Sequence, residues 1–240
     1  MNTVPKTTHP VVSEKEWLAA GLGLLKKEKA FTRQRDELTK QRQELPWMEV
    51  KKYEFDTTQG KKTLADLFGD KNQLMTYHFM FAPGWEEGCP GCSFVSDHFD
   101  AVVRHLETKG IAFVAVSRAP LQEFLPFKAR MGWNFEWVSS NGSEFNYDFG
   151  VSFRREDLDR GPVLYNFVEQ KLRSEEQPGL SVFFKDEEGR IYRTYSTYER
   201  GLDLLIGVYN FIDLTPVGRN EQSPMDWVEF HGRRSACCEE

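Results

Sequence analysis

The sequence predicts an α/β domain with a central mixed sheet flanked by helices, preceded by a helical extension. Two apolar segments, residues 73–81 and 111–116, are typical of strands buried on both faces. The amphipathic helical pattern between them completes a βαβ unit, which predicts parallel strands joined by a right-handed crossover. The chain has 240 residues, 40% of them hydrophobic, which is enough for one domain with a full core.

The N-terminal part, residues 1–44, is expected to be a helical arm. Ser13 and Glu16 have the spacing of a capping box, so a helix is predicted over residues 14–44. Residues 26–43 are charged almost all round, which is typical of a solvated helix. A polar arm before a core can also dock on a second subunit, so a homodimer through this arm is the alternative.

The predicted main domain covers residues 45–216, followed by an irregular tail at residues 217–240. Alternation, apolar runs and turn residues predict its elements. Strands are expected at residues 52–55, 73–81, 111–116, 135–138 and 164–168, and as a hairpin of 180–185 with 190–195. A short helical turn is expected at residues 63–69, and a turn or short helix at 145–150. Helices are expected between Cys92 and Gly110 and at residues 121–131 and 202–212. The last helix is apolar all round, so it is expected to pack on the sheet.

A cysteine motif, Cys89-Pro90-Gly91-Cys92, joins the first buried strand to the helix that follows. The N-terminus of a helix offers unpaired N–H groups and the positive end of its macrodipole, which lowers the pKa of a thiol. Pro90 suits the first helical turn, Gly91 helps shape it, and the spacing puts both sulfurs on one side. The hypothesis is a dithiol–disulfide redox centre in which Cys89 is the nucleophile and Cys92 resolves it. Two cysteines packed as small apolar residues are the alternative.

A structural zinc site is the metal alternative, but zinc needs four ligands and this motif supplies two. His98 is placed on the far side of the helix, within its apolar row, so we expect an internally hydrogen-bonded core histidine. Cys237 and Cys238 could relay electrons or tether a partner, although a tail without a chemical role is the simpler interpretation. We expect no metal and no other cofactor.

Four further residues are candidates for supporting or substrate-binding roles. Tyr77 and His78 point to opposite faces of the first buried strand, and His78 could take a proton from Cys92 or be a satisfied core histidine. Arg118 ends the second strand at the sheet edge of the cysteine loop, where it could stabilise a thiolate, bind an anionic substrate or form a structural salt bridge. Trp85 is expected to pack beside the loop.

Composition excludes several classes of function. The apolar runs are too short for a membrane span, and residues 1–10 lack the apolar region of a secretion signal. The net charge is −6 with both signs interspersed, so neither nucleic acid nor a membrane is an expected partner. We therefore expect a cytoplasmic protein.

The order of elements, with a CxxC at the first helix, resembles the thioredoxin-like fold, and Trp85 completes a W-x-x-x-C-x-x-C pattern. More specifically, residues 45–216 resemble the bacterial DUF899 family of predicted dithiol–disulfide oxidoreductases. The matching segments are Tyr77-His78-Phe79-Met80-Phe81, Gly88-Cys89-Pro90-Gly91-Cys92-Ser93-Phe94, Asp97-His98-Phe99-Asp100, Ala115-Val116-Ser117-Arg118-Ala119-Pro120, Gly132-Trp133, Phe145-Asn146-Tyr147-Asp148-Phe149-Gly150-Val151-Ser152 and Tyr195-Ser196-Thr197-Tyr198-Glu199-Arg200-Gly201-Leu202-Asp203. Two thioredoxin features are absent: no Asp lies on the strand that leads into the cysteines, and Pro178 precedes the expected proline position, which Leu180 occupies.

The resemblance implies a thiol–disulfide oxidoreductase that acts on a protein or small-molecule disulfide and is served by a separate electron donor. A thiol peroxidase, in which Cys89 becomes a sulfenic acid and Cys92 resolves it, is the alternative within the same chemistry. A non-enzymatic binding or scaffold protein with a structural or metal-holding cysteine pair is the alternative from another class.

Overall fold

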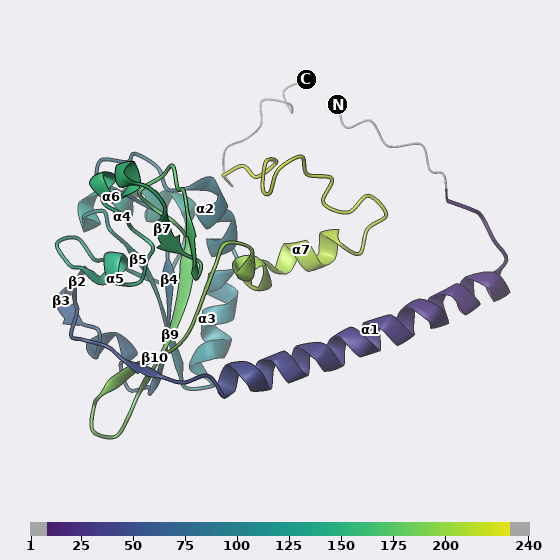
Figure 1. Ribbon diagram of the computed structural model, residues 1–240, viewed down its shortest axis with the longest axis horizontal. Coiled ribbons are helices and arrows are strands. Elements are labelled where there is room, and N and C mark those ends of the chain that lie inside the picture. The colour runs from purple at the N-terminus through teal and green to yellow at the C-terminus, as the bar shows by residue number, and fades with distance from the viewer. Residues whose placement is uncertain (1–8, 231–240) are drawn as a thin grey trace. The chain divides into compact units, whose positions relative to one another are not determined.

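The structure, a computed structural model, describes residues 9–230. The chain divides into two compact units, one that ends at Pro46 and one that begins at Trp47. Each unit is described by itself below, and Figure 1 labels the elements of both.

The first unit contains one long helix, α1 (Glu14–Gln43). The Ser13 hydroxyl accepts the Glu16 backbone N–H at 3.4 Å, and the Glu16 carboxylate accepts the Ser13 backbone N–H at 2.9 Å. The predicted helix and its capping box are therefore confirmed. None of the residues of α1 is buried, and the exposed side chains include Trp17, Leu24 and Phe31.

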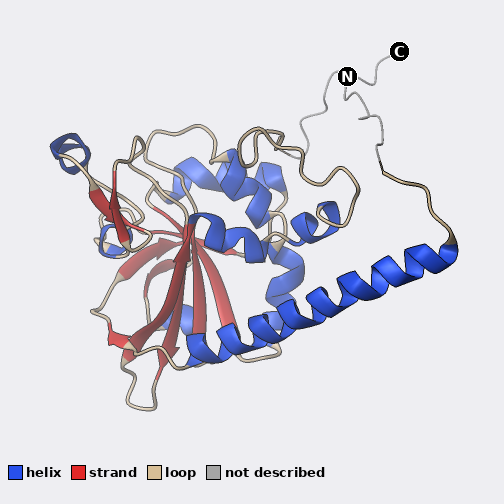
Figure 2. Cartoon of the chain, turned by 45° about the vertical axis from the view of Figure 1, so that its right-hand side comes forward, coloured by secondary structure: helices blue, strands red, loops and turns tan. Residues whose placement is uncertain are grey.

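The second unit is built on a mixed sheet, drawn as the red arrows of Figure 2. Within residues 9–230, the main sheet has eight strands in the order β1-β10-β9-β4-β5-β6-β2-β3, and a separate hairpin pairs β7 with β8. The strands are β1 (Met48–Glu49), β2 (Glu54–Thr57), β3 (Gly60–Thr63), β4 (Gln73–His78), β5 (Ile111–Ser117), β6 (Glu136–Ser139), β7 (Val163–Tyr165), β8 (Val168–Gln170), β9 (Gly179–Lys185) and β10 (Ile191–Tyr198).

Helices and 3₁₀ turns connect these strands. They are η1 (Asp66–Phe68), α2 (Pro90–Ser96), α3 (Phe99–Glu107), α4 (Leu121–Met131), α5 (Phe145–Asp148), α6 (Arg155–Arg160), η2 (Glu199–Leu205) and α7 (Gly207–Ile212). Most of the expected helices and strands are present, with boundaries that differ by a few residues. The edge strands β1 and β3 and the helix α6 were not predicted, and the single strand expected at residues 164–168 is the hairpin of β7 and β8.

The direction of the strands defines the fold. β4, β5 and β6 run parallel, and the predicted βαβ unit joins β4 to β5 through α2 and α3. β9 runs antiparallel to both β4 and β10. This central arrangement, with the cysteine motif at the first helix after β4, is a thioredoxin-like fold, as the sequence predicts.

The two faces of the sheet bury different clusters, because successive side chains of a strand point to opposite faces. Tyr77 and Phe79 belong to the cluster beneath α2, α3 and α4. Leu74, Val114 and Phe183 belong to the cluster on the other face, with Phe145 of α5. In Figure 1, α2 and α3 lie on one side of the sheet and α5 on the other. β4 therefore contributes to both cores, and it also carries the cysteine loop at its end.

Two predicted helices differ in the structure. The helix expected between Cys92 and Gly110 is interrupted at Asp97 and His98, which separate α2 from α3. The His98 side chain explains the break, because its Nδ1 lies 2.9 Å from the carbonyl oxygen of Phe94. Its Nε2 accepts the Val208 backbone N–H at 3.3 Å, so the prediction of an internally bonded histidine is confirmed.

The helix predicted at residues 202–212 is the second difference. The segment forms the 3₁₀ helix η2 and the short helix α7. Leu202, Ile206 and Tyr209 are buried, whereas Leu204 and Phe211 are 64% and 73% exposed. The segment therefore packs on the core through one stripe of its apolar residues, and the single predicted helix is two shorter ones.

The chain after α7 is irregular up to Phe230, and it packs against the domain. Trp227 contacts Phe94 of α2, with ring centroids 5.2 Å apart, and Phe230 is buried against Phe127 of α4. Cys237 and Cys238 lie outside the described residues.

Candidate active site

The cysteine motif begins at the N-terminus of α2. Cys89 is the capping residue, and Pro90 occupies the first turn, as the sequence predicts. The Cys89 backbone N–H donates to the Met80 carbonyl oxygen at 3.2 Å, which ties the motif to the end of the buried strand. The Ser93 hydroxyl and backbone N–H both donate to the Cys89 carbonyl oxygen at 2.9 Å. These bonds hold the Cys89 side chain at the start of the helix.

Two glycines allow the loop to approach its neighbours closely. A Cβ at Gly88 would lie 2.5 Å from the ring of Phe79, so a larger residue would displace either the ring or the loop. A Cβ at Gly91 would lie 3.0 Å from the sulfur of Met225 and 3.8 Å from the sulfur of Cys89. Gly91 therefore lets the C-terminal segment come close to the cysteines.

The two cysteines differ in exposure. Both are free thiols 4.0 Å apart, and Cys89 is partly exposed whereas Cys92 is buried. A small movement would bring the sulfurs to the length of a disulfide, about 2.05 Å. Cys89 is therefore the thiol that a reactant can reach, and Cys92 lies behind it.

The environment also separates the two thiols in acidity. The pKa of Cys89 is lowered to about 6, because the Cys92 thiol and the backbone N–H groups of Cys92 and Gly91 donate hydrogen bonds to its sulfur, against the effect of burial. Burial raises the pKa of Cys92 well above its usual value, and the adjacent Cys89 adds to this. At neutral pH the pair holds one proton, on Cys92, and the exposed sulfur is a thiolate.

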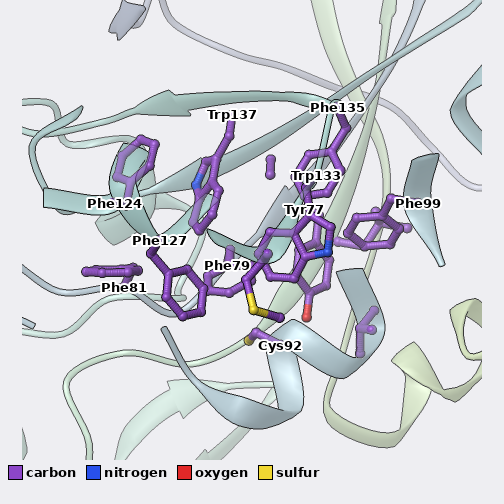
Figure 3. Close-up of a cluster of buried hydrophobic side chains, with 14 of the residues drawn as sticks. Tyr77, Phe79, Phe81, Cys92, Phe99, Phe124, Phe127, Trp133, Phe135 and Trp137 are labelled. Carbon is purple, nitrogen blue, oxygen red and sulfur yellow. The ribbon is translucent and has the colours of Figure 1, made fainter. Parts of the chain in front are cut away.

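Tyr77 approaches the cysteines from below. Its side chain is fully buried, and Figure 3 shows its hydroxyl end directed towards the helix that carries Cys92. Within residues 9–230 the hydroxyl meets no partner with the distance and angles of a hydrogen bond. Burial and the neighbouring cysteines raise its pKa, so it keeps its proton, and it favours the thiolate form of Cys92.

His78 faces the other side of the sheet. Its Nε2 lies 2.9 Å from the Ser181 hydroxyl, and its ring packs against Phe145 and Phe149. The prediction that His78 could take a proton from Cys92 is therefore wrong, because Tyr77 occupies the cysteine face and the next residue must point away. Burial lowers the pKa of His78 to about 3, so its ring is neutral.

Arg118 forms the structural salt bridge that the sequence left open. Its Nε donates to a carboxylate oxygen of the buried Glu176 at 2.6 Å, and its Nη1 donates to the Tyr147 hydroxyl at 3.3 Å. Burial raises the pKa of Glu176, while Arg118 and a hydrogen bond from Ser152 oppose this. Arg118 is not among the residues that line the pocket at the cysteines.

Trp85 lies within the cysteine loop and is partly buried against the core. Its ring centroid is 6.5 Å from that of Phe81. Pro178 precedes β9 and lines the pocket, whereas Leu180 pairs with Tyr77 inside the sheet. No peptide bond is cis in the described part of the chain.

A pocket of about 340 Å³ opens onto the cysteines. Tyr77, Cys89 and Cys92 form part of its lining, with residues from η2 and from the chain after α7. Its apolar members are Val95, Pro178, Leu202, Pro224 and Met225. The sequence did not predict the residues of η2 as part of the site, although residues 195–203 are among the matching segments. Pro224 and Met225 lie in an irregular stretch without periodicity, so no sequence signal identified them.

Neither a metal site nor a membrane span is found in the described residues. Over residues 9–230, no group of three or more His, Cys, Asp or Glu side chains is arranged to hold a metal ion. No helix in that range combines the length and the hydropathy that crossing a membrane requires.

Solved structures with a similar fold were found, whereas curated proteins gave no match. One is the peroxidoxin BcpB from Mycobacterium tuberculosis, with 14% identity over 70% of this chain and 97% of that chain, and a TM-score of 0.45. A PrxQ mutant from Xylella fastidiosa has 14% identity over 69% and 94%, with a TM-score of 0.44. BsSco, a member of the Sco family of cytochrome c oxidase assembly proteins, has 15% identity over 68% and 92%, with a TM-score of 0.39.

The family of the chain is shown by its sequence. Residues 6–233 match the family model DUF899, described as a bacterial protein of unknown function. The match covers the arm, the thioredoxin-like domain and the cysteine motif. The chain therefore belongs to the DUF899 family.

Proposed function

We propose that the protein is a dithiol–disulfide oxidoreductase in which Cys89 attacks and Cys92 resolves. The observation that carries this proposal is that the pKa of Cys89 is lowered and the pKa of Cys92 is raised. A lowered pKa makes the accessible Cys89 a thiolate at neutral pH, which is the form that attacks a disulfide. A raised pKa keeps Cys92 protonated until Cys89 has been consumed.

The reaction needs two exchange steps. The Cys89 thiolate attacks one sulfur of a disulfide R–S–S–R′, forms the mixed disulfide Cys89–S–S–R, and releases R′–S⁻. Cys92 then gives its proton to the departing thiolate and attacks the Cys89 sulfur, which releases R–S⁻. The products are the Cys89–Cys92 disulfide, R–S⁻ and R′–SH, so two electrons pass from the protein to the substrate.

Tyr77 supports the second step. Its hydroxyl favours the thiolate form of Cys92, and Cys92 must become a thiolate to attack. Because the pKa of Tyr77 is raised, the phenol acts as a hydrogen-bond donor and not as a base. Tyr77 thus assists by donating a hydrogen bond to the Cys92 sulfur in this step, whereas a carboxylate at this place would accept the Cys92 proton.

A thiol peroxidase is the second candidate, favoured by the small pocket at the same thiolate. There Cys89 would attack the terminal oxygen of a hydroperoxide R–O–OH, giving a sulfenic acid and an alcohol after protonation. Cys92 would then displace water to form the same disulfide. A binding protein without redox chemistry would form no such disulfide.

Both redox candidates require regeneration by an electron donor, and in the expected cytoplasmic location reducing thiols would surround the pair.

A second copy of the chain is a further proposed partner. Trp17, Leu24, Phe31 and Leu38 of α1 are exposed at intervals of seven residues, which places them on one line of the helix. Sedimentation velocity of Leu24→Glu/Phe31→Glu against the unaltered chain tests this: loss of a dimer supports the arm as the interface, and an unchanged sedimentation coefficient contradicts it.

The experiment for the proposed function is peptide mapping after mild oxidation. The reduced chain is treated with diamide, trapped by alkylation and digested without reductant. A Cys89–Cys92 disulfide is expected, also in the variant Cys237→Ser/Cys238→Ser, which removes the tail thiols from the assay. If Cys89 and Cys92 stay alkylatable as free thiols, both redox candidates fail. Cys92→Ser should instead accumulate a mixed disulfide between Cys89 and an added disulfide.

A further inference from the structure

The residues after α7 form one wall of the pocket at the cysteines. We call residues 213–230 the C-terminal strap. Met225 of the strap lines the pocket and lies against Gly91, where an added Cβ would come within 3.0 Å of its sulfur. Pro224, beside it, also lines the pocket. The strap therefore restricts the approach to Cys89 on the side of α2.

Several contacts hold the strap in place. Trp227 packs edge-on against Phe94, and its indole N–H donates to Glu221 at 2.6 Å. Glu221 also accepts the hydroxyl of Tyr209 from α7 at 3.1 Å. Phe230 is buried against Phe127. The strap is thus fixed on both sides of Met225, next to Cys89.

Each charged residue that lines the pocket has a polar partner. Arg200 binds Asp203 at 2.8 Å, and Asp203 also binds Arg219 at 3.1 Å. Glu199 accepts a hydrogen bond from Asn166 at 2.9 Å. Two carboxylates and one guanidinium thus line the pocket, so it carries no surplus of positive charge for an anionic ligand.

The remaining polar group of the pocket is the Tyr77 hydroxyl. It is fully buried, it borders the pocket, and within residues 9–230 it makes no hydrogen bond of acceptable geometry. This hydroxyl acts on Cys92, whose thiolate form it favours, so it adds no charge to the pocket. The site therefore suits a small, apolar and uncharged molecule.

We propose that this pocket binds a small, uncharged organic disulfide as the substrate of Cys89, and that the strap excludes folded proteins. The inference rests on the proposed function and adds the substrate class to it. The chemistry is the two-step exchange given above: the Cys89 sulfur bonds to one sulfur of the small disulfide while the other leaves as a thiolate. Cys92 then closes the intramolecular disulfide and releases the second thiolate.

Single-turnover kinetics test the substrate class without any electron donor. The reduced chain is mixed with bis(2-hydroxyethyl) disulfide, oxidised glutathione or insulin at equal disulfide concentration, and the Cys89–Cys92 disulfide is counted by mass after acid quenching. Each rate is divided by the rate of dithiothreitol with the same reagent, which corrects for intrinsic reactivity. The corrected rate for the small neutral disulfide is expected to exceed the other two by about tenfold or more, equivalent to about 1.4 kcal/mol.

Three strap variants examine the pocket wall. Met225→Glu places a charge in the pocket and is expected to slow the small disulfide about tenfold, equivalent to about 1.4 kcal/mol. Leu214→Glu adds the same charge to the same strap at a position 81% exposed and outside the pocket lining, so its rate should stay at the wild-type value. Trp227→Ala removes the contact with Phe94 and is expected to raise the corrected rate with insulin.

The outcomes separate this inference from the proposed function. Corrected rates that are equal for all three reagents, or a Met225→Glu rate equal to wild type, overturn the small-disulfide site while the redox function stands. A faster corrected rate for insulin makes proteins the substrate class and also overturns it. If no reagent, diamide included, yields the Cys89–Cys92 disulfide, the proposed function itself fails.

Discussion

The hydroxyl of Tyr77 is fully buried beside Cys92, and it favours the thiolate form of that cysteine. Burial and Cys89 act on Cys92 in the opposite direction and raise its pKa. The strand that ends in the cysteine loop thus places a neutral donor below the resolving thiol. This relationship makes Tyr77 a positioning residue for the second exchange step.

Replacing Tyr77 with Phe is expected to slow resolution without slowing the first attack. The loss of one hydrogen bond to the developing Cys92 thiolate should reduce the second step by about tenfold, or about 1.4 kcal/mol. Rapid quenching with mass analysis would show the mixed disulfide accumulating in Tyr77→Phe. The alkylation rate of Cys89 serves as the control and should stay unchanged. Resolution at the wild-type rate would remove Tyr77 from the mechanism.

The reactivity of Cys89 is expected to rise with pH through a midpoint of about 6. A lowered pKa means that the thiolate fraction is small below the midpoint and nearly complete at pH 7, whereas an ordinary thiol with a pKa of about 8.5 is mostly protonated there. Iodoacetamide labelling followed by peptide mass analysis measures this for each cysteine. Cys92 should label only after unfolding. A midpoint of Cys89 near that of a free thiol would contradict the assignment of the nucleophile.

His78 is expected to make the fold sensitive to acid. Its pKa in the folded state is about 3, and an unfolded histidine titrates near 6.5, so between these values the unfolded state binds a proton that the folded state does not. Stability should therefore be unaffected by this group above about pH 6.5 and fall by up to about 1.4 kcal/mol for each lower pH unit until the folded form titrates.

Urea unfolding of His78→Gln against wild type over pH 4–8 measures that slope. The variant should lose less stability on acidification, whereas the same change at the exposed His105 should leave the slope as it is. Parallel pH profiles for His78→Gln and wild type would show that the buried ring does not control acid stability.

Arg118 is expected to matter for stability more than for redox chemistry. Arg118→Met leaves the buried Glu176 carboxylate without its cation, which typically costs about 3–5 kcal/mol. Adding Glu176→Gln should recover much of that loss, because the buried charge is removed as well. Unfolding curves measure both effects. A large upward shift of the Cys89 labelling midpoint in the double variant would instead place Arg118 at the thiolate.

The fold could be predicted from the sequence where side-chain periodicity and covalent geometry decide the outcome. The apolar runs at β4 and β5 and the cysteine motif between them placed the nucleophile at a helix N-terminus. Alternation along β4 also placed Tyr77 and His78 on opposite faces. This alternation does not predict which face of the sheet α2 covers, because both faces of a central strand are buried and apolar.

Other parts of the site depend on tertiary contacts that leave no periodic signal. Met225 reaches the cysteines through an irregular segment that is fixed by the rings of Trp227 and Phe230. The break between α2 and α3 follows from the His98 side chain bonding to Phe94 and Val208, and Val208 is far away in sequence. The sequence left three roles open for Arg118, and its structural role became clear only from its buried partner Glu176.

The most direct test of the redox pair is an equilibrium titration of the Cys89–Cys92 couple. The chain is incubated in dithiothreitol buffers of graded reduced-to-oxidised ratio, trapped with acid, and the disulfide fraction is determined by mass. The account predicts a single two-electron transition, in which a tenfold change of the ratio corresponds to about 30 mV, and its absence in Cys89→Ser. Two thiols that stay reduced across the whole range, or a transition that survives in Cys89→Ser, would contradict it.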